Sequence, residues 1–181
     1  VQGTEGEGIK AVNVSVRDLA GNPGSASISV TFDFTAPKIS TLTVNPTIAR
    51  AGVILTITFT VSETVEDYPL VTVAGNAAIF ITKVANNYTY TYTVQGIEQE
   101  ESDSPVNVSA ADSAWNIGSA STTVTLDFTG PYCSADNSEV QHGEDIMITL
   151  TATDDTSGIA IAKYNWDTPC LLYTSPSPRD R

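Results

Sequence analysis

Carboxylates are the side chains of this sequence whose type and placement could bind a ligand. The chain carries 21 Asp and Glu against 8 Lys and Arg, so its formal net charge is −13. Ca²⁺ takes roughly six to eight oxygen ligands, mostly from carboxylates and carbonyls. The candidate ligands are Asp33, Glu63 and Asp112, followed along the chain by Asp127 and Asp154. They make Ca²⁺ the one candidate cofactor, with the alternative that these are solvated turn residues, because Asp favours turns.

Other kinds of chemistry have little support in the sequence. The single histidine, His142, stands in Gln-His-Gly-Glu just before an expected strand, with no nucleophile motif beside it. The glycine-rich start at Gly3–Gly8 lacks the lysine and the following helix of a phosphate-binding loop. Cys133 is expected to behave as a small apolar strand residue. We therefore expect that the chain is not an enzyme and has no catalytic residues.

The charge also limits the partners. An acidic surface repels nucleic acid phosphates and anionic lipid. The sequence has no apolar run near the ~20 residues that a membrane-spanning helix needs. We therefore expect neither nucleic acid binding nor membrane insertion.

The elements that must position the carboxylates are β-strands. Apolar residues alternate with Thr and Ser in several short runs, which is the period of a half-buried strand. The clearest run has Leu55, Ile57, Phe59 and Val61 on one face. Short runs separated by Gly and Asn predict an all-β, antiparallel β-sandwich.

An internal repeat divides the chain. Residues 12–37 and 106–131 align without a gap at an offset of 94, and 17 of the 26 positions are identical. A second match places residues 146–151 on residues 55–60, at an offset of 91. The interval from residue 38 to residue 131 contains seven expected strands, which is the size and strand count of an immunoglobulin-like domain.

Two motifs carry a resemblance to a known family. Val14-Ser-Val-Arg-Asp18-Leu-Ala-Gly-Asn22 is followed by Asp33-Phe-Thr-Ala-Pro37, and both recur after 94 residues with Trp115 in place of the glycine. This pattern resembles the bacterial Ig-like repeats of large surface and adhesin-type proteins. The resemblance implies tandem Ig-like sandwiches with Greek-key connections, in a stalk or adhesive array that is secreted or on the cell surface.

The repeat sets the expected domain boundaries. Residues 1–37 are the C-terminal part of one repeat, 38–131 a complete repeat, and 132–169 the N-terminal part of a further one. Residues 170–180 match, codon for codon, a translated DNA-sequencing adapter, so 170–181 is interpreted as an adapter-derived artefact of a metagenomic or genomic read. Because Val1 is not an initiator Met, we expect an internal fragment of a larger extracellular protein.

The sandwich predicts where the carboxylates meet. Glu63, Glu66 and Asp67 follow the second strand of the complete repeat, and Asp112 opens the loop before its last strand. These two loops share the end of the sandwich that faces the preceding repeat. Asp33 lies in the linker at that end, so we expect the carboxylates to converge there. The same reasoning brings Asp127 near Asp154 and Asp155 at the next junction.

Aromatic residues admit two interpretations. Tyr88, Tyr90 and Tyr92 alternate with threonines, which predicts a strand with its tyrosines in the core, or else an exposed ligand platform. Trp166 is expected in the core.

For the whole chain we predict a structural spacer or adhesive repeat region whose partners are neighbouring repeats and a host or cell-surface ligand. The alternatives are a ligand- or glycan-binding module and an accessory domain of a secreted hydrolase.

Overall fold

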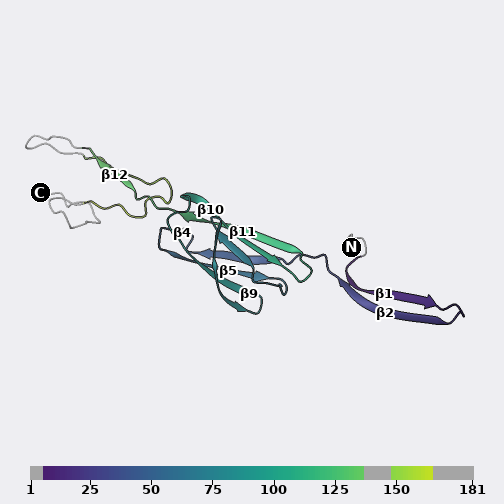
Figure 1. Ribbon diagram of the computed structural model, residues 1–181. Helices are drawn as coiled ribbons and strands as arrows, with labels where there is room; N and C mark the ends of the chain where they lie inside the picture. Colours follow the sequence, from purple (N-terminus) through teal and green to yellow (C-terminus); the bar gives the residue numbers. More distant parts are fainter. Residues whose placement is uncertain (1–5, 137–147, 165–181) are drawn as a thin grey trace, which may run out of the picture.

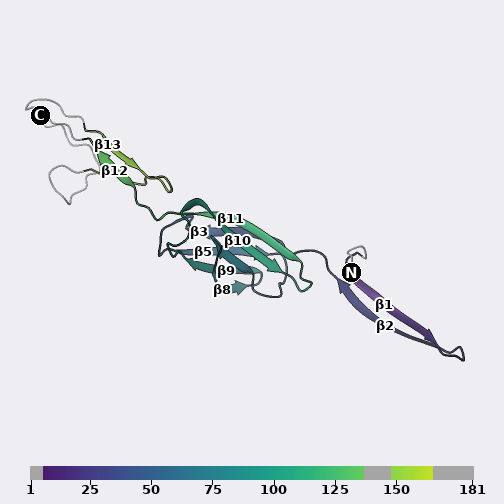
Figure 2. The ribbon, with the colours of Figure 1, turned by 45° about the horizontal axis from the view of Figure 1, so that its top comes forward.

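The computed structural model describes residues 6–136 and 148–164, and all its regular elements are β-strands. Figures 1 and 2 show three groups of strands in line: a hairpin, a central sandwich and a second short pair. The hairpin is β1 (Gly8–Arg17) and β2 (Pro23–Phe32), and the last pair is β12 (Tyr132–Ala135) and β13 (Leu150–Thr153). The expected all-β fold is confirmed. None of the described residues forms a helix long and apolar enough to cross a membrane.

The central sandwich has two sheets. One has the strand order β4-β11-β10-β6-β7 and the other β3-β5-β9-β8. All pairs are antiparallel except β4 with β11, which is parallel. The strand bounds are β3 Ile39–Asn45, β4 Ile48–Ala49, β5 Ile54–Val61, β6 Leu70–Val73, β7 Asn76–Ala77, β8 Ile79–Val84, β9 Asn87–Thr93, β10 Glu101–Ala111 and β11 Ile117–Leu126. The two-residue strands β4 and β7 add to the seven expected, because Ile48–Ala49 joins the edge of β11 and a tight turn folds Asn76–Ala77 back on β6.

Alternating side chains from both sheets form the core. Leu55, Ile57, Phe59 and Val61 of β5 are all at most 2% exposed, and they belong to the same core cluster as Val106 and Val108 of β10. Burial of such apolar area is the main favourable contribution to folding. The intervening threonines of β5 lie on the outer face of the sheet, as the period-2 pattern predicts.

The tyrosine ladder belongs to this core. Tyr88, Tyr90 and Tyr92 of β9 are 1%, 3% and 6% exposed, so the core interpretation is confirmed. Phe59 stacks on Tyr88 and Tyr90, with ring centroids 5.3 Å and 5.8 Å apart. The Tyr90 hydroxyl donates to the Pro69 carbonyl at 2.6 Å, and burial raises the pKa of Tyr90 to about 12. The alternative interpretation, in which these rings form an exposed ligand platform, is therefore wrong.

The sequence repeat has a matching backbone. Val12 pairs with Ile28 in the β1–β2 hairpin, and Val106 pairs with Thr122 in the β10–β11 hairpin, so the register is the same at the offset of 94. The turns also match. Asp18 Oδ1 accepts the Asn22 N–H at 2.8 Å, and Asp112 Oδ1 accepts the Asn116 N–H at 2.9 Å.

The left-handed residue of each turn is the one before the asparagine. It is Gly21, with φ at 91°, in the first hairpin and Trp115, with φ at 66°, in the second. The reason is that each asparagine side chain and N–H is held by the preceding aspartate. The residue before it must then turn the chain. This geometry is easy for glycine and strained for tryptophan.

Cys133 lies in β12, as expected for a strand residue, and it is an exposed free thiol. His142, Trp166 and residues 170–181 lie outside the described residues.

Candidate metal centre

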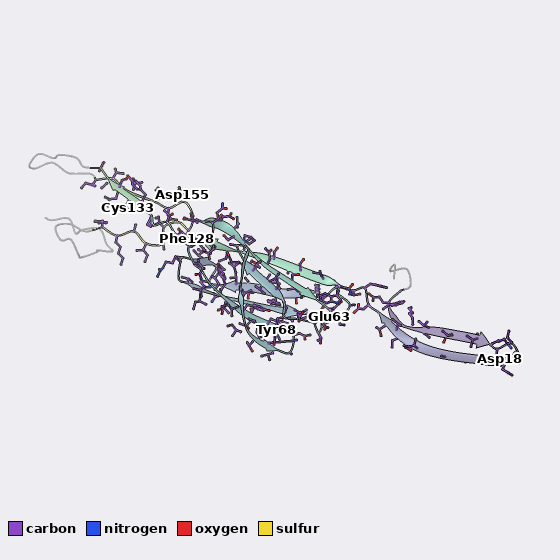
Figure 3. All side chains as sticks on the ribbon, in the orientation of Figure 1. Asp18, Glu63, Tyr68, Phe128, Cys133 and Asp155 are labelled. Atoms are coloured by element: carbon purple, nitrogen blue, oxygen red, sulfur yellow. The ribbon has the colours of Figure 1, made fainter. Side chains whose placement is uncertain are left out.

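Three of the five candidate carboxylates converge at one end of the sandwich. Asp33 lies in the linker just after β2, Glu63 follows β5, and Asp112 follows β10. One oxygen of each lies within 4.8 Å of the others. Figure 3 shows Glu63 at the end of the sandwich that faces β1–β2. The convergence arises because β5 and β10, although in opposite sheets, both end there.

Asp112 is the most constrained of the three. Its side chain is 1% exposed. Oδ1 accepts the N–H groups of Ala114 and Asn116 at 2.8 Å and 2.9 Å, and Oδ2 accepts Asn116 Nδ2 at 2.9 Å. The Asn116 side chain, followed by the backbone donors, holds the pKa of Asp112 below its usual range. The carboxylate is therefore ionised and fixed in position at neutral pH.

Asn116 also connects the sandwich to the linker. Its Nδ2 donates to the Asp33 carbonyl oxygen at 3.1 Å, and the Asp33 side chain accepts the Thr35 N–H at 3.1 Å. Close by, Gly118 lies against Pro37, since a Cβ at Gly118 would be 1.7 Å from the Pro37 carbonyl oxygen. The linker is thus held on the sandwich by a hydrogen bond and by close packing.

The donor set fits a hard cation. Three carboxylates this close repel one another, and the repulsion is relieved by a cation that prefers oxygen ligands. Asp33, Glu63 and Asp112 would hold it, with backbone carbonyls and water completing the set. Glu63 and Asp33 are half-buried, so an ion could reach them from solvent. Ca²⁺ binding by this group remains a prediction.

The other two candidates lie at the opposite end of the sandwich and do not form such a group. Asp127 and Asp154 line one groove, which is formed by β4 and its flanking residues together with the segments that follow β11 and β13. Asp127 accepts the Thr129 N–H at 3.1 Å, as Asp33 accepts Thr35. Asp154 Oδ1 accepts the N–H groups of Thr156, Ser157 and Gly158, and the Gly158 bond contributes most to lowering its pKa.

The two ends of the sandwich correspond in the repeat but differ in their acidic residues. At the offsets of 94 and 91, Asp127 corresponds to Asp33 and Asp154 corresponds to Glu63. Among the described residues, only the first junction brings three such side chains within 4.8 Å of one another.

No model of a known protein family matches the chain, and a search of curated proteins gives no match. Its function is therefore inferred from its own residues.

The three remaining acidic residues that were expected at the junctions are exposed. Asp155 lies at the far junction, where it was expected (Figure 3), whereas Glu66 and Asp67 border a pocket beside Trp115.

Sequence reasoning missed Glu98, which is 8% exposed. It accepts the N–H groups of Gln95, Gly96 and Ile97 and the hydroxyl of Tyr92. A lone Glu in a loop gives no signal for such burial, because its partners are the backbone of that same loop.

Proposed function

We propose that the chain is a spacer segment of a larger extracellular or cell-surface protein, built from tandem β-sandwich repeats of the bacterial Ig-like kind. The supporting observation is the geometric repetition. The β1–β2 hairpin has the pairing register and the turn hydrogen bonds of β10–β11, on the other side of a short linker. Its role is structural and not enzymatic.

The order of the strands supports such an array. The sandwich receives the chain from β2 at one end and passes it to β12 at the other (Figures 1 and 2). A domain whose two connections leave from opposite ends adds length to a chain of domains. The linker at the first end is fixed by Pro37 and by the Asn116 bond to Asp33, so successive repeats keep a defined orientation.

The outer units are consistent with the proposal. The apolar side chains Val12, Val14 and Val16 of β1 are 48%, 54% and 60% exposed, whereas their counterparts Val106, Val108 and Ala110 are buried. A two-stranded hairpin has marginal stability alone. We assign residues 1–37 to a repeat whose other strands precede them in the parent protein.

Single-molecule pulling on the full chain, attached at its two ends, tests the spacer role. Residues 39–126 hold about 300 Å of extended chain, at roughly 3.3–3.6 Å per residue. We expect one cooperative unfolding event whose contour length approaches that value. Gradual extension without such an event would contradict a sandwich that resists force as a unit.

Within this proposal, Ca²⁺ binding by Asp33, Glu63 and Asp112 stiffens the junction. Isothermal titration of the full chain with CaCl₂ tests this step separately. We expect binding that Asp112→Asn abolishes. Asp18→Asn is the matched control, because Asp18 makes the same turn bonds in the first hairpin and is not in the acidic group. The absence of a heat of binding at millimolar Ca²⁺ would contradict the metal site. It would not affect the spacer role, which the pulling experiment tests separately.

A further inference from the structure

The outer face of the β6–β10–β11 sheet carries a groove. It runs along the central strand β10 and has a volume of about 410 Å³. Strand pairing aligns its outward side chains in rows, with Leu70 and Ser119 on either side of Ser109. The next row places Thr72 and Ser121 on either side of Asn107. The groove exists because the central strand carries small or medium side chains.

The outward side chains of β6, β10 and β11 form the floor of the groove, and they are chemically alike. Apart from Leu70, its outward side chains are hydroxyls and one amide, which both donate and accept hydrogen bonds. Its lining includes no Lys or Arg. A ligand that matches such a floor presents many neutral hydroxyl groups.

Aromatic and acidic side chains surround one end of the groove. A second pocket, of about 190 Å³, shares Leu70 and Ser109 with the first and is lined further by Tyr68, Trp115 and Ile117. Tyr68 and Trp115 are 65% and 71% exposed. Glu66 and Asp67 border the same pocket.

Tyr68 is held in place by aromatic contacts. Its ring lies 4.2 Å, centroid to centroid, from Phe80, which meets Tyr90 edge-on at 5.5 Å. Tyr90 belongs to the core. An exposed ring anchored in this way loses little freedom when a ligand stacks on it.

Trp115 lies at a position where tryptophan strains the backbone. Its φ is 66°, while the matching position of the first hairpin has Gly21, which adopts this conformation easily. A bulky residue that keeps a strained backbone and yet remains exposed suggests a function other than packing.

We propose that this groove binds a neutral oligosaccharide. The rings of Tyr68 and Trp115 offer apolar faces for a sugar ring, because such rings combine an apolar body with a polar tip. Glu66 and Asp67 accept hydrogen bonds from sugar hydroxyls, and the Ser, Thr and Asn floor pairs with the rest. The acidic lining and the net charge of −13 repel an anionic glycan, so the ligand that fits is a neutral one. The groove follows β10 from Ala111 to Asn107, about 14 Å at ~3.4 Å per residue, so it suits a short oligosaccharide.

The test is calorimetric titration of the full chain with four neutral probes: cellohexaose, laminarihexaose, mannohexaose and xylohexaose. We expect at least one to bind. Trp115→Ala is expected to weaken that binding about tenfold, the loss of one stacking contact. Asn107→Ala, on the exposed floor, is a second variant that removes hydrogen bonds without touching the turn.

Tyr132→Ala is the matched control. Tyr132 is 69% exposed but lies on β12, away from the groove, so its loss should leave the affinity unchanged. Two results would overturn the proposal: no binding of any of the four sugars, or binding that neither Trp115→Ala nor Asn107→Ala weakens. Melting curves establish that each variant is folded.

Discussion

Replacement of Glu98 by alanine should destabilise the sandwich more than any other single change to its loops. The carboxylate accepts three N–H groups of its own loop and the buried Tyr92 hydroxyl. Burial alone would raise the pKa of Glu98, but the bonds from Gln95 and Tyr92 outweigh it and leave the pKa lowered. The ionised form is therefore the one that the fold stabilises.

The magnitude follows from the groups left without partners. The buried Tyr92 hydroxyl costs about 1–3 kcal/mol when unsatisfied, and the half-buried N–H groups cost less because water can replace the carboxylate. We expect Glu98→Ala to lower the free energy of unfolding by about 3–5 kcal/mol. This is a large part of the ~5–15 kcal/mol typical of a domain. Tyr92→Phe alone should cost about 1 kcal/mol, because the carboxylate keeps its backbone partners.

Urea denaturation of the two single variants and the double variant is the assay. Once Glu98 is gone, Tyr92→Phe removes an orphaned hydroxyl, so the double variant should be about 1–2 kcal/mol more stable than additivity predicts. Asp103→Asn, on the exposed side of β10, is the control and should have little effect. Additive losses, or a loss below 1 kcal/mol for Glu98→Ala, would refute this role for the carboxylate.

The pH dependence has a defined sign. Because the folded-state pKa of Glu98 is lowered, its contribution is present above the unfolded value of about 4.3 and is lost as the pH falls through the folded value. The difference in stability between the wild type and Glu98→Gln should therefore shrink below about pH 4.

Three further changes have clear expected outcomes. Trp115→Asn should raise the free energy of unfolding by about 0.5–1 kcal/mol, because Asn tolerates positive φ and Trp115 is mostly exposed; destabilisation in urea would mean that the indole packs. Gly118→Ala should cost at least about 2 kcal/mol, since its Cβ would strike the Pro37 carbonyl, whereas Gly24→Ala should be tolerated because its nearest contact, 3.2 Å away, is the end of a side chain. A chain that ends at Pro169 should melt like the full chain, and a fall of more than a few degrees would contradict the adapter interpretation.

Side-chain alternation and the repeat were enough to predict the sandwich and the first junction. Leu55, Ile57 and Phe59 could be assigned to the core from their spacing alone. The proximity of Glu63 and Asp112 could be predicted, because the loops that follow their two strands lie at the same end of the sandwich.

Other features depend on contacts that no local pattern encodes. The left-handed turn at Trp115 could not be predicted, because asparagine is the better candidate until its bonds to Asp112 are known. The groove depends on which outward residues the register places side by side, such as Leu70 beside Ser109.

Hydrogen exchange on the full chain, read by mass spectrometry, tests most directly the central claim that it contains one complete sandwich flanked by parts of two others. Slow exchange should be confined to β3–β11, whose strands pair within two packed sheets. The β1–β2 and β12–β13 pairs should exchange orders of magnitude faster, since each is a two-stranded sheet with exposed apolar faces. Protection of β1–β2 equal to that of β10–β11 would contradict the claim.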